Sequence, residues 1–208
     1  MDKKTIKHER INIIGVGGVG SILVDLLHSL EFKRVNLIDF DQVEKKNLKR
    51  QNFSEEHIGM YKAEVLAERY KYEFQNEYYT GDERLSGIIV SCVDNNKSRV
   101  AIKNQSNIIK IFCANETKDA EAYIGCKETY ELNKNAFIEE EHVEKVHCTD
   151  EEVDPQTKVA NMTAAIMAIN LILNINKKLL KEDICPIMIR SCGQIFNTIR
   201  LGDIRCTT

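Results

Sequence analysis

Residues 11–62 read INIIGVGGVGSILVDLLHSLEFKRVNLIDFDQVEKKNLKRQNFSEEHIGMYK. A short apolar run at residues 11–15 closes on a glycine-rich turn, and an apolar segment with helical spacing follows the turn. A second apolar run, residues 35–39, ends in Asp39. A strand, a glycine turn, a helix and a strand with an acidic end, in that order, predict the first βαβ unit of a parallel sheet.

The rest of the chain continues this alternation of strands and helices. The segments expected to be helical are 18–30, 59–74, 97–109 and 159–175. The further runs expected to be strands are 88–93, 108–114, 120–128 and 184–202, the last as two strands joined at Cys192–Gly193. The pattern predicts an α/β fold with a Rossmann-like doubly wound, mostly parallel sheet and C-terminal antiparallel strands.

Residues 131–158 form the longest polar and acidic stretch between these expected elements. We expect them to form a long crossover loop, and loops of this length in compact domains are usually functional or mobile. Neither an internal repeat nor a low-complexity linker interrupts the sequence. We therefore expect residues 1–208 to form a single domain.

The composition excludes several classes of protein. Apolar residues make up 43% of the chain, which permits a normal core, and the net charge of −3 argues against a broad nucleic-acid-binding surface. No apolar run is long enough to span a bilayer, and the charged start does not resemble a signal peptide. An odd number of cysteines, seven, favours a reducing compartment. The expected location is the cytoplasm.

The glycine turn and the residues after it predict a site for a nucleoside triphosphate. Gly15, Gly17 and Gly20 would let backbone amides approach a phosphate at the start of a helix. Asp39 stands where a ribose hydroxyl would lie. Arg50 and Lys62 add two full positive charges, which a departing pyrophosphate needs in order to leave.

Asp94 follows the expected strand 88–93 and would therefore lie at the carboxyl edge of the sheet, where it could hold Mg²⁺. It could also be the N-cap of the following helix, and capping and metal binding can coexist. A nicotinamide site is the competing interpretation of the glycine turn. That interpretation leaves the polar residues from Asn47 to Gln51 unexplained and offers no acid or base for a hydride pocket.

Four motifs in this order resemble the ThiF/MoeB/HesA superfamily, the adenylating domain of ubiquitin-activating-type enzymes. They are GVGGVGS (15–21), DFDQVEKKNLKRQ (39–51), GMYK (59–62) and CVDNNKSR (92–99). The resemblance implies Mg²⁺-dependent transfer of an adenylyl group from ATP to the C-terminal glycine carboxylate of a ubiquitin-like or sulfur-carrier protein with a Gly-Gly tail. It also implies a homodimer. The residues implied to bind the nucleotide are Gly15, Gly17, Gly18, Gly20, Asp39, Asp41, Asn47, Arg50, Gln51, Lys62, Asp94 and Asn95, with Asp94 on the metal.

The chain departs from the family pattern at its cysteines. No pair of C-x-x-C motifs is present, so we expect no structural zinc. Cys148 lies in the expected crossover loop, at the place where conjugating members of the family carry an acceptor cysteine, although its surroundings are acidic. Three alternatives stay open: a carboxylate on a modified tRNA base as the substrate, a peptide as the substrate, or a non-catalytic role in a heterodimeric activating enzyme.

Overall fold

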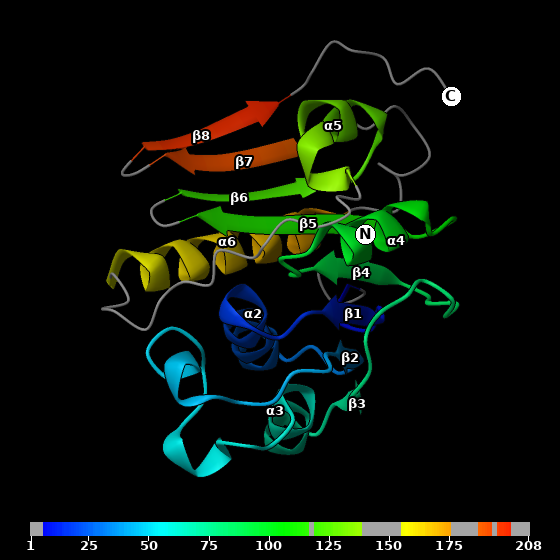
Figure 1. Ribbon diagram of the computed structural model, residues 1–208. Helices are drawn as coiled ribbons and strands as arrows, with labels where there is room; N and C mark the ends of the chain where they lie inside the picture. The colour runs from blue at the N-terminus through cyan, green and yellow to red at the C-terminus, as the bar shows by residue number, and fades with distance from the viewer. Residues whose placement is uncertain (1–5, 117–118, 139–154, 176–186, 193–194, 201–208) are drawn as a thin grey trace.

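The computed structural model describes residues 6–116, 119–138, 155–175, 187–192 and 195–200 (Figure 1). These residues build an eight-stranded sheet with the order β3-β2-β1-β4-β5-β6-β7-β8. The neighbours from β3 to β5 in this order run parallel, and those from β5 to β8 run antiparallel. The predicted Rossmann-like sheet with C-terminal antiparallel strands is confirmed.

The bounds of the elements follow the predicted alternation. The strands are β1 (Ile11–Ile14), β2 (Val35–Ile38), β3 (Glu73–Gln75), β4 (Ile88–Ser91), β5 (Ile109–Glu116), β6 (Asp119–Ile124), β7 (Ile187–Cys192) and β8 (Ile195–Arg200). The helices are α2 (Gly18–Ser29), α3 (Lys62–Tyr70), α4 (Asn96–Asn104), α5 (Lys127–Leu132) and α6 (Pro155–Asn174), with short 3₁₀ turns η1 (Lys45–Asn47), η2 (Glu55–His57) and η3 (Lys134–Phe137). None of the helices described here is long and apolar enough to cross a membrane.

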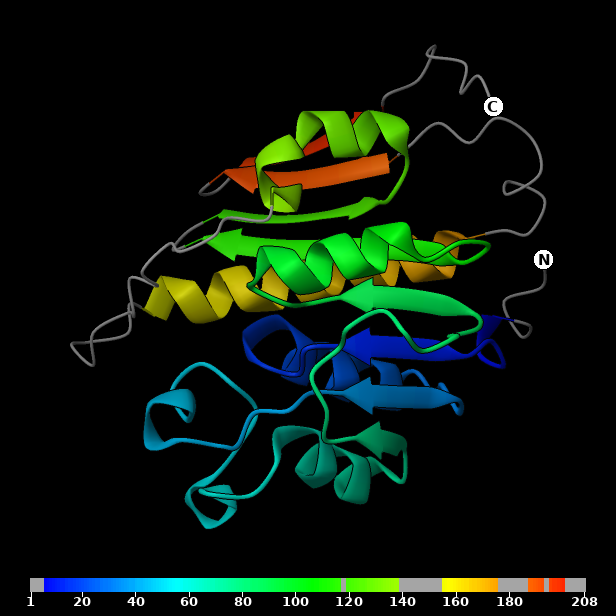
Figure 2. The same ribbon diagram turned by 45° about the vertical axis from the view of Figure 1, so that its right-hand side comes forward.

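Two hydrophobic clusters cover the two faces of the sheet. One packs side chains of α2, α3 and α6 against the strands, and the other packs α4, α5 and η3. Ile13 and Ile14 are consecutive in β1 but belong to different clusters, because successive strand residues point to opposite faces. Figures 1 and 2 show α4 and α5 in front of the sheet and α6 behind it. Burial on both faces explains why β1, β2 and β4 are mostly apolar.

The helix expected at residues 59–74 is shorter than predicted. It begins at Lys62 and ends at Tyr70, because Lys71 adopts a left-handed conformation with φ of 60°. The amide of Tyr72 then donates to the carbonyl oxygen of Ala67 at 3.0 Å, which closes the last turn. The chain continues directly into β3, a strand that the sequence analysis missed.

The helix expected at residues 97–109 also ends early, at Asn104. Gln105 is already extended, and Asn107 has a φ of 56°. The Lys110 ammonium donates to the carbonyl oxygens of Lys103 and Gln105, at 2.9 and 2.5 Å, and so binds the negative end of α4.

The crossover loop expected at residues 131–158 is wrong at both ends. At its start the chain forms α5 and η3, whose Tyr130 and Phe137 rings pack edge-on against Phe112 of β5. At its end α6 begins at Pro155, a residue suited to a first helical turn. Residues 139–154 lie outside the described residues.

Candidate functional site

The glycine turn joins β1 to α2 at very close range. Gly15 has a φ of +87°, and a Cβ atom there would lie 2.9 Å from the carbonyl oxygen of Cys92. A Cβ atom on Gly20 would overlap the carbonyl oxygen of Gly15. Gly17 is the N-cap of α2, and within the described part of the chain no side chain caps this helix. The first amides of α2 are therefore left for an anion.

Asp39 organises the turn from the end of β2. Its Oδ2 accepts the amide of Val16 at 2.6 Å, and its Oδ1 accepts the amide of Asp41 at 2.8 Å. Burial raises the pKa of the Asp39 carboxyl, and the two amides and the nearby Lys62 charge oppose that rise. Each carboxylate oxygen keeps capacity for a further donor, such as a ribose hydroxyl.

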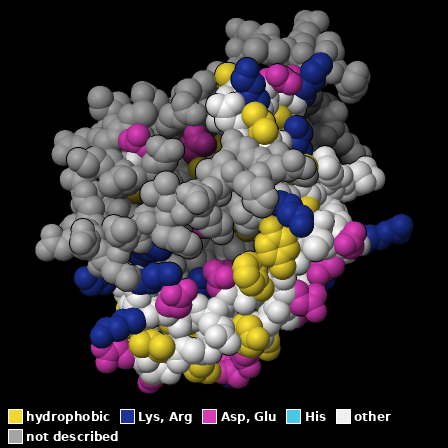
Figure 3. All heavy atoms as spheres, in the orientation of Figure 1, with side chains coloured by type: hydrophobic (Ala, Val, Ile, Leu, Met, Phe, Trp, Pro, Cys, Tyr) yellow, Lys and Arg dark blue, Asp and Glu magenta, His cyan; other side chains and the backbone are white. Residues whose placement is uncertain are grey.

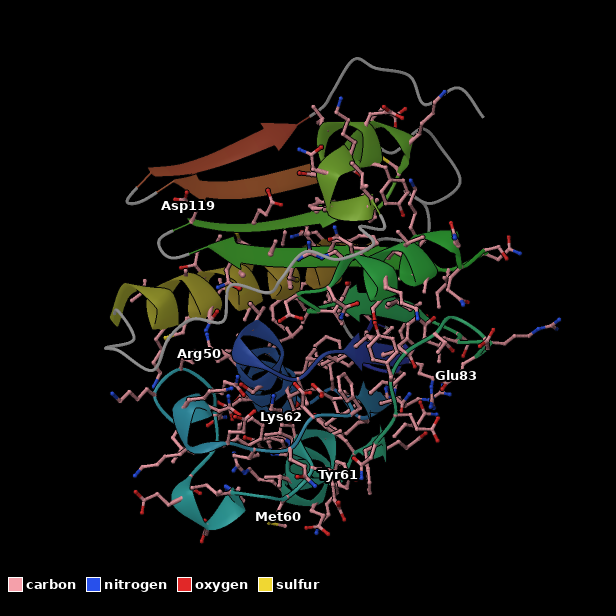
Figure 4. All side chains as sticks on the ribbon, in the orientation of Figure 1. Arg50, Met60, Tyr61, Lys62, Glu83 and Asp119 are labelled. Atoms are coloured by element: carbon pink, nitrogen blue, oxygen red, sulfur yellow. The ribbon has the colours of Figure 1, made fainter. Side chains whose placement is uncertain are left out.

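Lys62 places a buried positive charge beside Asp39. Its ammonium donates to Oδ2 of Asp41 at 2.8 Å, while its side chain is 6% exposed and that of Asp41 is 49% exposed. In Figure 4 Lys62 lies nearer to α2 than Met60 and Tyr61, which are exposed at the lower edge. The half-exposed Asp41 carboxylate thus pairs with the Lys62 ammonium, which is otherwise buried.

The segment around η1 presents Arg50 and Gln51 to the same turn. Asn47 is buried, its Oδ1 accepts the amide of Glu44 at 2.9 Å, and its carbonyl accepts the amides of Arg50 and Gln51. Arg50 Nε and Gln51 Oε1 are buried and make no hydrogen bond to any residue that the structure describes. Asn47 therefore shapes the segment, and the two unpartnered atoms are ones that a bound ligand could satisfy.

Asn95 has the helix-capping role that the sequence analysis considered for Asp94. Asn95 is the N-cap of α4, because its Oδ1 accepts the amide of Ser98 at 2.8 Å and the hydroxyl of Tyr78 at 2.9 Å. The N-cap interpretation of Asp94 is therefore wrong. Asp94 is exposed and makes no hydrogen bond or ion pair to another described residue. Its carboxylate is available to a metal.

The strand register brings these residues to one edge. The amide of Gly15 donates to the carbonyl of Ile38 at 2.9 Å, and the amide of Cys92 donates to the carbonyl of Ile14 at 2.8 Å. The glycine turn, the end of β2 and the end of β4 consequently meet at the carboxyl ends of parallel strands, where ligands bind in such sheets. A triphosphate fits this edge, because it would meet uncapped helix amides and cationic groups.

Residues 1–75 match the model of the ThiF family. The predicted resemblance to the ThiF/MoeB/HesA superfamily is confirmed. Two relatives are the ubiquitin-like modifier-activating enzyme 5 of Drosophila persimilis, 32% identical over 49% of this chain and 33% of its own, and that of Culex quinquefasciatus, 29% identical over 51% and 33%. The chain spans about a third of the length of these relatives.

Solved ThiF-like structures share the fold over most of the chain. MccB of E. coli, in complex with MccA-N7isoASN, superposes with a TM-score of 0.65 and 20% identity over 98% of this chain and 68% of its own. The tRNA N6-threonylcarbamoyladenosine dehydratase TcdA of E. coli, in complex with ATP, has a TM-score of 0.62 and 18% identity over 86% and 88%. At these identities the likeness establishes the fold.

The candidate site contains one residue that the sequence analysis did not single out. Asn161 of α6 is 2% exposed, and its Nδ2 donates to the carbonyl oxygen of Arg50 at 3.2 Å. A lone polar residue on the buried face of an otherwise apolar helix was the available signal.

The cysteines of the ThiF-like chain are only partly described. Burial raises the pKa of the thiol of Cys126, the N-cap residue of α5. Cys148, the predicted acceptor, lies outside the described residues. Within the described ranges no group of three or more His, Cys, Asp or Glu side chains could hold a metal ion.

Proposed function

We propose that this chain is an ATP-dependent adenylyltransferase that activates a carboxylate. The observation that supports this most is the buried Lys62 ammonium on Asp41, next to Asp39 and the uncapped start of α2. A cation held in a low-dielectric position stabilises negative charge on a departing pyrophosphate far better than an exposed one. The relatives named ubiquitin-like modifier-activating enzyme 5 point to the same chemistry.

Each residue of the site has a role in this proposal. The α2 amides between Gly17 and Gly20 would receive phosphate oxygens, and Asp39 would accept a ribose hydroxyl. Lys62 would leave Asp41 for the triphosphate, and Arg50 would use its unpartnered Nε on the same group.

Asp94 would hold Mg²⁺ together with phosphate oxygens. A bound Mg²⁺ would neutralise part of the phosphate charge.

The reaction needs no general base. A substrate carboxylate is already ionised at neutral pH, and one of its oxygens would attack the α-phosphorus of ATP. The bond from that phosphorus to the β-phosphate oxygen would break, and pyrophosphate would leave with the bonding electrons. The site therefore has to position two anions and stabilise the charge that moves between them.

We propose the C-terminal glycine of a ubiquitin-like or sulfur-carrier protein as the carboxylate. The names of the relatives support this choice. MccB, crystallised with MccA-N7isoASN, and TcdA, named for a tRNA nucleoside, keep a peptide and a tRNA as alternatives. On the described part of the face in Figure 3, basic and acidic side chains are interspersed, which favours a protein over an RNA.

A second step would use Cys148. Its thiolate would attack the acyl carbon of the adenylate, forming a thioester and releasing AMP. Replacing Cys148 with serine should leave adenylation intact and abolish the thioester, which a non-reducing gel with labelled carrier protein would reveal. A thioester that survives the Cys148→Ser change would rule this cysteine out.

Pyrophosphate exchange tests the proposed function. Wild-type protein should exchange labelled pyrophosphate into ATP in the presence of a carrier protein ending in Gly-Gly. Lys62→Met, which keeps the length of the side chain, and Asp94→Asn should each lower the rate by about 100-fold or more. Lys33→Met is the matched control, since Lys33 is exposed and outside the site.

The pattern of exchange distinguishes the alternatives. Exchange with a peptide or a tRNA in place of the carrier would change the substrate class but keep the chemistry. ATP binding without exchange on any of the three would indicate the non-catalytic partner of a heterodimer. Normal exchange by both variants would remove Lys62 and Asp94 from the site.

A further inference from the structure

Asn161 is a buried polar side chain that connects three distant parts of the chain. It lies on α6, its Nδ2 donates to the carbonyl oxygen of Arg50 at 3.2 Å, and the two residues are 111 positions apart in the sequence. A Cβ atom on Gly18 would lie 2.6 Å from the same Nδ2 and 2.9 Å from Oδ1. The amide therefore rests on the first turn of α2 and holds the segment that carries Arg50.

The side chain of Asn161 lies among buried apolar residues of its own helix. The neighbouring buried residues of α6, Ala160, Ala164 and Ala165, are small and apolar. A side-chain amide buried among such residues is costly unless its groups find partners. A leucine of similar size would serve packing at least as well.

The absence of a side chain at Gly18 explains how the contact is possible. Any larger residue there would displace the Asn161 amide from the N-terminal turn of α2. Gly18, the first residue of α2, thus leaves room for the side chain that binds the Arg50 carbonyl. Asn161 therefore contacts both the first turn of α2 and the segment that carries Arg50.

We propose that Asn161 is a positioning residue for Arg50 in the adenylation reaction, an inference that rests on the proposed function. With the Arg50 carbonyl fixed, the guanidinium that carries the unpartnered Nε starts from a restricted set of positions. A charged group that is already in place stabilises the transition state without reorganisation. Asn161 acts through the backbone of Arg50 and touches no reacting atom.

The test is a double-mutant cycle between Asn161 and Arg50, read by pyrophosphate exchange. Asn161→Asp keeps the shape of the side chain but removes the N–H that binds the Arg50 carbonyl. We expect kcat to fall by about 10- to 100-fold, as for a small misplacement of a catalytic group, with less than about a threefold change in ATP affinity. In an Arg50→Ala background the same change should have almost no further effect. Asn170→Asp, on an exposed position of α6, is the matched control and should leave kcat unchanged.

Hydrogen exchange gives a reading that does not depend on activity. Amides of residues 47–53 should exchange faster in the Asn161→Asp protein, while those of β1 and β4 should not. Unchanged kcat and unchanged exchange in residues 47–53 would overturn the inference and leave the proposed function standing. Equal losses in the wild-type and Arg50→Ala backgrounds would also overturn it. A wild-type protein that neither binds ATP nor exchanges pyrophosphate would overturn both.

Discussion

The Asp39 carboxylate is buried at the end of β2 and accepts hydrogen bonds from two backbone amides. The Val16 amide links it to the glycine turn, and the Asp41 amide links it to the segment that holds Lys62. Burial of the charge nonetheless outweighs these contacts, and the pKa of Asp39 is raised. The two amides hold the Asp39 carboxylate in position for a ligand, while burial of its charge lowers the stability of the folded protein.

The raised pKa of Asp39 predicts a pH dependence of stability. The folded protein binds the Asp39 proton more tightly than the unfolded chain does, so the free energy of unfolding falls as the pH rises from 3.8 through the raised pKa. The Asp39→Asn variant lacks this titration. Urea unfolding should show wild type losing stability relative to the variant over that pH range. A difference that stays flat, or that shifts in favour of wild type with rising pH, would contradict the assignment.

At the scale of elements, the end of α3 decides where β3 can form. Lys71 holds a left-handed conformation, and the amide of Tyr72 returns to the carbonyl of Ala67. The Tyr72 hydroxyl then donates to the carbonyl oxygen of Phe32 at 3.0 Å, so the turn is fixed by a contact outside the helix. Lysine is a poor residue for this conformation, and tertiary contacts impose it.

Replacing Lys71 with glycine should therefore stabilise the protein. Glycine adopts the left-handed region without steric cost, and the gain is about 0.5–1 kcal/mol after its greater freedom in the unfolded chain is counted. Chemical denaturation of Lys71→Gly and Lys71→Ala measures it. Lys71→Ala keeps the strain and should show no gain, so equal stability of the two variants would argue against strain at this turn.

At the scale of the whole molecule, α6 is apolar on the side that faces away from the sheet. Four of its large side chains, Val159, Met162, Ile166 and Leu173, are between 40% and 61% exposed. Their spacing places them along one side of the helix, opposite the alanines that pack on α2 and the strands. An apolar stripe of this kind, here interrupted by the exposed Asn170, is typical of a surface that a partner covers.

We expect this stripe to be part of a homodimer interface, as the family resemblance implies. Placing lysines at Met162 and Ile166 together should shift the protein from dimer to monomer at micromolar concentration, because two buried charges would oppose association. Sedimentation velocity measures the change. Leu132→Lys, at a 58% exposed position on α5, is the control. Wild-type protein that sediments only as a monomer would refute the interface.

The sequence alone determined the fold class and singled out most of the residues that meet at the candidate site, because these depend on local patterns. Short, mostly apolar runs mark strands buried on both faces, and glycines at fixed spacing mark a turn that permits no side chain at Gly15 or Gly20. Asp39 followed from its position at a strand end. All of these signals lie within a few residues of the feature they predict.

Tertiary structure decided what depends on contacts between distant segments. Ending α3 at Tyr70 required an αL residue and a contact with Phe32, and Asn95 rather than Asp94 became the N-cap through geometry at α4. Asn161 reaches Arg50 only because α6 packs beside α2. Such contacts leave no periodic trace in the sequence, because their partners are brought together by packing of the sheet and its helices.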